Sequence, residues 1–147
     1  MNWHDDVFPI LLAVVCGAAI GLERQLKHKP AGLRTNILIC LGAAVFTIIS
    51  ERMAGDRDSV TRIAAQIVTG VGFLGAGAVI QDRGGIHGLT TAATIWLVAS
   101  VGTACGARLY GLAVISTVLA IVVLLGLAQL EKHLGAGRPD EKENRSR

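Results

Sequence analysis

Charged side chains are absent from most of this chain. Asp, Glu, Lys and Arg make up 17% of its 147 residues, and five runs of 16 to 24 residues contain none of them. An α-helix rises about 1.5 Å per residue, so each run would be roughly 24–36 Å long, close to a hydrocarbon core of about 30 Å. Because a water-soluble helix of this length needs a charged face, the runs predict an all-α, polytopic membrane bundle. Its five expected transmembrane helices cover Val7–Leu22, Thr35–Ser50, Ile63–Gln81, Gly84–Ala107 and Leu109–Leu130.

Residue types that carry catalysis, metal binding and nucleic-acid recognition are also scarce. The three cysteines all lie inside apolar runs, and the four histidines lack the spacing of a zinc site. Aromatic residues make up 4% of the chain, and its pattern lacks the basic, aromatic-bearing surface that nucleic-acid binding requires. The pattern also lacks a nucleophile–base pair. We therefore predict no enzymatic activity, no cofactor, no metal site and no nucleic-acid partner.

The distribution of Lys and Arg predicts how the bundle is oriented. If the N-terminus lies outside, ten Lys and Arg residues face the cytoplasm and four face the exterior. Cytoplasmic loops of membrane proteins carry an excess of these residues, so an N-out, C-in orientation is predicted. The net charge of +3 then serves topology and attraction to lipid headgroups, with the lipid bilayer as the main partner.

The last 17 residues differ in composition from the rest. Glu131–Arg147 contains nine charged residues together with glycine and proline. Such a segment cannot bury enough apolar surface to order itself. We expect one transmembrane domain over residues 1–130 and a disordered cytoplasmic tail over residues 131–147.

Glycines recur at helical spacing within the apolar runs. The segment Gly70–Gly75 matches the dinucleotide-binding pattern G-x-G-x-x-G, but it lies inside an apolar run, without the strand and amphipathic helix that this pattern needs. Small residues four apart let helix backbones approach closely in membranes. We therefore expect helix packing at Gly17, Gly21, Gly70, Gly72, Gly75, Gly77, Gly102 and Gly106.

Polar residues near the membrane are costly, so those present are candidates for function. One dense group is expected at the inner ends of the first two helices and comprises Glu23, Arg24, Arg34, Thr35 and Asn36. Opposite charges at a membrane edge gain from meeting one another. We expect Glu23 to pair with Arg34, or to share a network with Arg24 and Asn36.

A second group of polar residues lies within or beside the later apolar runs. Its members are Arg62, Gln66, Asp82, Thr90, Thr91 and Thr94. Because Arg62 and Gln66 are four residues apart, they share a helix face, and both should point into the bundle rather than at lipid. The alternative interpretation is topological: charges end the helices, Arg62 extends to the interface, and the threonines bond to carbonyls of their own helix.

Three groups of motifs indicate a family. They are Gly21–Gln25 with Ala31–Asn36 and Gly42–Phe46, then Arg62–Gln66 with Gly72–Gly77, and finally Gly88–Thr94 with Trp96, Gly102 and Cys105-Gly106. These motifs cover about Gly17 to Gly106 in order, and together they resemble the MgtC/SapB family of bacterial membrane proteins. The resemblance implies a five-helix protein of the bacterial cytoplasmic (inner) membrane, linked to growth at limiting magnesium and, in pathogens, to virulence.

The resemblance also implies a mode of action. The best-known members resemble regulators that restrain the F-type ATP synthase, so another membrane protein is the expected partner, with a homo-oligomer as a further option. Many virulence-associated members carry a folded cytoplasmic domain where this chain has its 17-residue tail, so the chain resembles a short form. Some members also have Asn in place of Thr90. Both departures weaken the transfer of the virulence role.

A transporter or channel for Mg²⁺ or another small solute is the alternative hypothesis. Mg²⁺ dehydrates reluctantly and prefers carboxylates in octahedral geometry. The five apolar runs contain no acidic residue, and Glu23 and Asp82 lie only at the inner edge. The residues therefore favour a regulator over a transporter.

The first four helices carry a pattern typical of a parallel duplication. A shift of 56 positions aligns Val15–Val45 with Val71–Val101, and ten of the 31 pairs are identical. The shared Gly-Leu-x-Thr sequence at the starts of the second and fourth helices is the most specific match. A parallel repeat of two helical hairpins would place Thr35 and Thr91 in equivalent positions beside one inner-face site.

Overall fold

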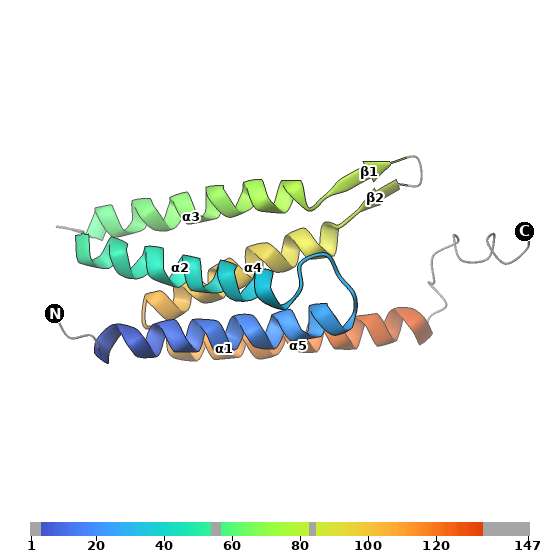
Figure 1. Cartoon of the computed structure of the whole chain (residues 1–147), viewed down its shortest axis with the longest axis horizontal. Coiled ribbons are helices and arrows are strands. Elements are labelled where there is room, and N and C mark those ends of the chain that lie inside the picture. The colour runs from blue at the N-terminus through green and yellow to red at the C-terminus, as the bar shows by residue number, and fades with distance from the viewer. Residues whose placement is uncertain (1–3, 54–56, 83–84, 134–147) are drawn as a thin grey trace, which may run out of the picture.

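A computed structural model describes the backbone of residues 4–53, 57–82 and 85–133, and the side chains of residues 5–53, 65–80 and 85–126. The described chain contains five helices and one short β-hairpin (Figure 1). The elements are α1 (His4–Leu26), α2 (Leu33–Met53), α3 (Arg57–Gly77), β1 (Ile80–Asp82), β2 (Gly85–His87), α4 (Leu89–Gly106) and α5 (Tyr110–His133).

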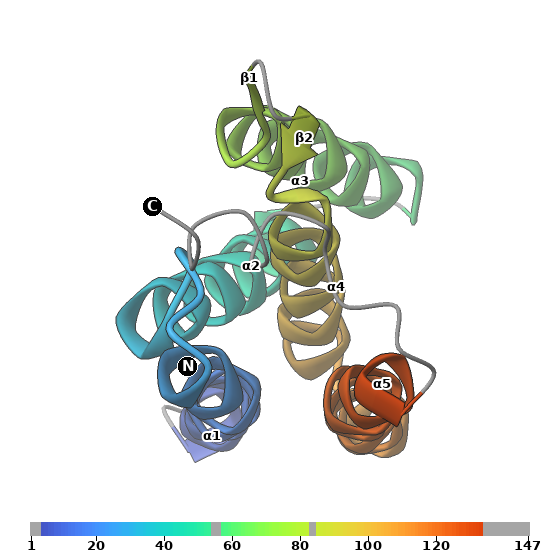
Figure 2. The same cartoon turned by 90° about the vertical axis from the view of Figure 1, so that its right-hand side faces the viewer.

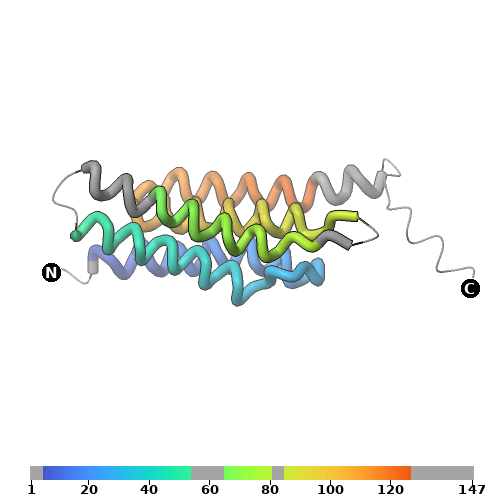
Figure 3. The backbone as a smooth tube through the Cα atoms, turned by 90° about the horizontal axis from the view of Figure 1, so that it is seen from above, coloured from blue at the N-terminus to red at the C-terminus, as the bar shows by residue number. Residues whose placement is uncertain are grey.

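The five helices run alternately in opposite directions along one long axis (Figures 1 and 3). The α1–α2 loop and the β-hairpin therefore share one end of the bundle, which we call the loop end. Within the described residues, three stretches are long and apolar enough to cross a membrane, namely Asp5–Leu26, Leu33–Met53 and Leu89–Gly106. Shorter apolar stretches lie in α3 and α5. The architecture is that of a helical membrane bundle.

The α2 helix packs tightly against α1 and α4 because glycines on both neighbours admit its backbone. An ideal Cβ at Gly17 would lie 2.9 Å from the Asn36 carbonyl oxygen, and one at Gly102 would overlap the Cys40 carbonyl oxygen. Gly21 and Gly106 meet α2 in the same way, one helical turn along. Small residues thus replace side-chain interdigitation at this crossing. These four glycines, predicted as helix-packing residues, lie where α2 approaches its two neighbours.

The glycines of α3 do not pack in this way. An ideal Cβ at Gly70, Gly72 or Gly77 would meet no atom within 4 Å, and one at Gly75 would make only ordinary contact with Ala92 at 3.8 Å. The packing prediction is therefore wrong for the first three. The reason is that α3 lies at the edge of the bundle, beyond α2 and α4 (Figure 2), and leaves much of its surface uncovered.

Strands β1 and β2 lie between α3 and α4, where the third and fourth apolar runs were expected to continue as helices. They pair antiparallel, with Ile80 opposite His87 and Asp82 opposite Gly85. Gly88 then caps the N-terminus of α4 with a φ of 89°. A Cβ at this position would overlap the Ala78 carbonyl oxygen. Glycine tolerates both the positive φ and the close approach. The sequence between β1 and β2 is Arg-Gly, whose polar and glycine residues favour a turn over a continued helix.

The observed helices extend past several predicted ends, by four residues at Leu26 of α1 and by six at Arg57 of α3. α5 continues to His133, three residues beyond the boundary at Leu130 that the charged tail predicted. The predicted disorder of the tail from residue 134 lies outside the described residues.

Candidate functional site

The last turns of α1 carry two charged side chains that are buried in the bundle. Glu23 exposes 8% of its surface and Arg24 exposes 3%. Arg24 Nη2 donates a hydrogen bond of 3.0 Å to Thr91 Oγ1 of α4, and the neighbouring Glu23 carboxylate attracts the same guanidinium. A buried charge is costly unless it is paired and hydrogen-bonded. This contact therefore couples α1 to α4 at the loop end.

Asn36 brings α2 into the same region. Its side chain is fully buried, and its Nδ2 donates to the carbonyl oxygens of Ala31 and Gly32, both at 2.8 Å. These bonds hold the end of the α1–α2 loop against the first turn of α2. We call Glu23, Arg24, Asn36 and Thr91 the buried polar cluster.

The cluster retains unused hydrogen-bonding capacity. Glu23 Oε2, Arg24 Nε and Asn36 Oδ1 are buried and have no hydrogen-bond partner in the part of the chain that the structure describes. Buried polar atoms are nearly always paired, and an unpaired one costs about 1–3 kcal/mol. The cluster is therefore a polar site enclosed by three helices rather than a set of incidental helix ends.

Two of the five residues predicted for this cluster lie at the surface. Arg34 and Thr35 are exposed on α2, whereas Asn36 is turned inward. Adjacent residues of a helix do not face the same partner, so these three positions cannot all reach α1. No ion pair joins Glu23 to Arg34 among the described residues, and Arg24 occupies the buried position instead.

The threonines at the start of α4 have separate roles. Thr94 Oγ1 donates to the Thr90 carbonyl oxygen at 2.7 Å, as the topological interpretation predicted, and Thr90 itself is exposed. Thr91 is buried and reaches Arg24 on another helix. Thr91 is therefore the member of this group that links two helices.

Gln66 does not point into the packed core, contrary to expectation. Its side chain is exposed and lies on the wall of a groove between α2 and α3. Gln66 is exposed because α3 lies at the edge of the bundle, where α2 covers only part of the helix face that carries this residue. The predictions for Arg62 and Asp82 concern side chains that the structure does not describe.

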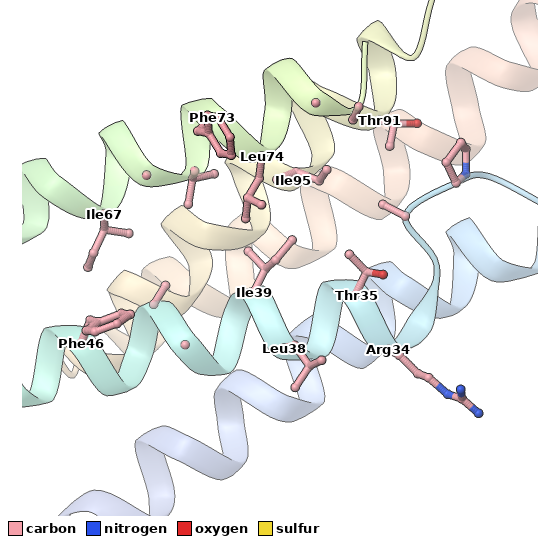
Figure 4. Close-up of a pocket in the computed structure, with 18 of the residues that line it drawn as sticks. Arg34, Thr35, Leu38, Ile39, Phe46, Ile67, Phe73, Leu74, Thr91 and Ile95 are labelled. Carbon is pink, nitrogen blue, oxygen red and sulfur yellow. The ribbon is translucent and has the colours of Figure 1, made fainter. Parts of the chain in front are cut away.

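A groove with a volume of about 1040 Å³ lies between α2 and α3 (Figure 4). Its walls are mainly aliphatic and aromatic, and α4 closes its base with Thr91 and Ile95. Thr35 and Thr91, predicted to lie beside one inner-face site, both line its loop end. Arg34 is the charged residue among the described groove residues, and it extends from α2 at that end.

A second, smaller cavity adjoins the groove at the loop end. It has a volume of about 590 Å³ and is lined by Gln25, Pro30, Gly32, Leu33, Arg34 and Thr35. Three of these residues, Pro30, Arg34 and Thr35, also line the groove. The two cavities therefore share Arg34 in their walls, and the smaller one has a mixed polar and apolar lining.

Sequence reasoning missed an ionic network at the opposite end of the bundle. Asp6 pairs with Arg52 and lies 3.8 Å from Arg108, and Arg108 also pairs with Glu51. The network ties α1 and α2 to the turn between α4 and α5. The sequence pattern assigns the charges at helix ends to topology alone. The alternating directions of the helices bring these particular ends together, and this shared location is the signal that could have suggested the pairing.

Residues 10–133 match the model of the MgtC family. The chain belongs to the MgtC family. As an MgtC family member it is 50% identical over 111 residues to the protein MgtC of Brucella abortus (strain 2308), covering 76% of this chain and 46% of the relative.

Two other relatives of this MgtC family member match over more residues. It is 46% identical over 128 residues to the putative magnesium transporter YhiD of Escherichia coli (strain K12), covering 82% of this chain and 59% of that protein. It is 42% identical over 130 residues to the uncharacterized protein slr0014 of Synechocystis, covering 88% and 55%. The chain thus spans about half the length of the curated relatives it matches. No solved structure matches it.

Proposed function

We propose that this chain is a non-enzymatic regulator of the bacterial inner membrane. It acts by binding another membrane protein, such as the F-type ATP synthase, when magnesium is limiting. In a bacterium that is a pathogen, it contributes to virulence. The observation that carries this proposal is the closed centre of the bundle. Gly17 and Gly102 approach the α2 backbone from two sides, so the space that a permeation path would need is filled by backbone contacts.

The charge of the open cavity supports the same conclusion. Mg²⁺ prefers oxygen ligands, carboxylates above all, and dehydrates reluctantly. The groove is mainly apolar, and the charge among its described residues is the cation of Arg34, which repels a divalent cation at the groove's polar end. A groove of this kind suits an apolar or anionic occupant better than a metal ion.

Transport of Mg²⁺ or another small solute is the second candidate. The relative from Escherichia coli is named a putative magnesium transporter, and Glu23 provides a buried carboxylate at the loop end. A single carboxylate beside an arginine is a weak cation site, because the guanidinium competes for the same charge.

Ion flux separates the two candidates. In proteoliposomes containing the purified full chain and a trapped Mg²⁺-sensitive dye, we expect Mg²⁺ entry no faster than in empty liposomes. An ionophore added at the end provides the positive control. Mg²⁺ entry in the wild type that Glu23→Gln abolishes would contradict the regulator and establish transport.

Action on the ATP synthase has its own readout. In inverted membrane vesicles that contain the synthase, we expect co-expression of the chain to slow ATP-driven acidification at an equal amount of synthase. The control is the chain with Gly102→Val, in which the clash with the Cys40 carbonyl oxygen forces α4 away from α2. Equal acidification with and without the folded chain would contradict this partner and leave another membrane protein to be found.

The orientation and the repeat belong to the same proposal. An N-out, C-in topology places the loop end in the cytoplasm, and fluorescence of green fluorescent protein fused after the last residue would support it. The repeat is supported by the starts of α2 and α4, Leu33 and Leu89, which are 56 positions apart. Thr35 is exposed and Thr91 is buried, so the two positions differ in burial. An experimental structure whose hairpins do not superpose would refute the repeat.

A further inference from the structure

The groove between α2 and α3 has the features of a binding site for one lipid molecule. We propose that it holds a single anionic phospholipid, with the acyl chains along the groove and the headgroup at Arg34. This proposal goes beyond the proposed function, because it holds whether the chain regulates a partner or transports a solute.

The length of the groove fits one leaflet of a bilayer. On α2 its lining extends from Arg34 at the loop end to Phe46, and Figure 4 shows these residues at opposite ends of the groove. Twelve residues of helix at about 1.5 Å each give roughly 18 Å. On α3 the lining from Gln66 to Gly77 covers a similar length. Half of a hydrocarbon core of about 30 Å is roughly 15 Å, so the groove matches the acyl chains of one leaflet.

The groove changes from apolar to polar where a headgroup would lie. Leu38, Ile39 and Leu74 form apolar walls along its length. At the loop end the lining changes to Arg34, Thr35 and Thr91, and the second cavity of about 590 Å³ opens beside it. Basic pockets between transmembrane helices at the headgroup level are typical sites for anionic lipids.

The positive charge at this end does not come from Arg34 alone. Arg24 lies behind Thr91 and donates to its hydroxyl oxygen, which leaves the Thr91 hydroxyl hydrogen free to bond elsewhere. Glu23 balances Arg24 inside the bundle, whereas Arg34 is exposed at the groove and takes part in no ion pair with the described residues. An anionic headgroup would supply the missing counter-charge.

The length of the site argues against a transmembrane helix as its occupant. A spanning helix crosses both leaflets and needs a contact surface of roughly 30 Å, about twice what the groove offers. A second copy of the chain would present such a helix. These occupants are therefore outcomes of the test rather than parts of the proposal.

Native mass spectrometry of the full chain in detergent tests the site directly. The probes are phosphatidylglycerol and phosphatidylcholine with identical acyl chains, added at matched concentrations. We expect the wild type to bind phosphatidylglycerol about fivefold more tightly, since one basic residue near a headgroup contributes about 1 kcal/mol. Arg34→Ala should remove this preference, whereas Lys29→Ala, a change at an exposed residue of the α1–α2 loop outside the groove, should keep it.

Filling the groove gives the second arm. Gly70 lines the groove and has open space at its Cβ position, so Gly70→Leu should abolish binding of both lipids. Gly72→Leu, on the same helix with open space but outside the groove, should bind as the wild type does. If Gly70→Leu fails to fold by circular dichroism, Gly42→Leu fills the groove from α2 instead.

Three results would overturn the proposal. Equal affinity of the wild type for both lipids would mean non-specific lipid contact only. Equal losses in Gly70→Leu and Gly72→Leu would place the lipid outside the groove. A change in oligomeric mass in Gly70→Leu, with lipid binding intact, would identify a second copy of the chain as the occupant.

Discussion

Gly102→Val is expected to destabilise the folded bundle strongly. A Cβ at this position would overlap the Cys40 carbonyl oxygen and lie 3.0 Å from Ala43 Cβ, so α4 would have to move away from α2. Overpacking in a core costs about 1–3 kcal/mol, and a clash with backbone on a neighbouring helix belongs at or above the upper end. Unfolding of the purified chain by sodium dodecyl sulfate, followed by circular dichroism, measures the loss.

A matched substitution separates the clash from the change of residue type. Gly72→Val places the same side chain in α3, where an ideal Cβ meets no atom within 4 Å, and we expect less than about 1 kcal/mol of change. Similar stability of the two variants would show that the close approach of α2 and α4 is not maintained in the membrane.

Arg24→Met should produce the second large effect. It removes the hydrogen bond to Thr91 and leaves the Glu23 carboxylate buried beside an apolar side chain. Losing a hydrogen bond from a charged donor costs about 1.5–3 kcal/mol, and the buried Glu23 carboxylate also loses the attraction of the Arg24 charge. The free energy of unfolding in the same denaturant titration measures this cost.

The double substitution Glu23→Gln, Arg24→Met tests the cause. If the cost arises from the unpaired carboxylate, the double variant should be more stable than Arg24→Met alone. Thr91→Val, which removes only the acceptor of one bond, should cost about 1–2 kcal/mol. A double variant no more stable than the single one would show that packing of the arginine, and not charge pairing, sets the effect.

The helices and the buried polar cluster were accessible from the sequence for the same physical reason. Membrane burial penalises charge, so charge-free runs mark the spans, and charged or amide side chains at their ends, such as Arg24 and Asn36, stand out. The sequence could not tell which of several neighbouring polar residues would turn inward. That choice depends on the rotation of α2 about its axis, which the glycine contacts determine, and it leaves Arg34 outside.

The edge position of α3 was not predictable from composition. Glycines such as Gly17 and Gly70 look alike in sequence, and only the arrangement of helices shows that one contacts a neighbour and the other faces open space. The groove follows from the same arrangement. The β-hairpin was missed because Ile80 and Ile86 extend the apolar character of the flanking runs past the ends of the helices.

α3 should separate from the bundle more readily than α4. Val71 and Gly75 are its buried residues within the described side chains, whereas α4 buries ten residues. Segments with few buried contacts open locally at a free energy well below that of global unfolding. Partial opening at α3 widens the groove while α4 stays packed, so a molecule held there can exchange with the bilayer without unfolding of the whole bundle.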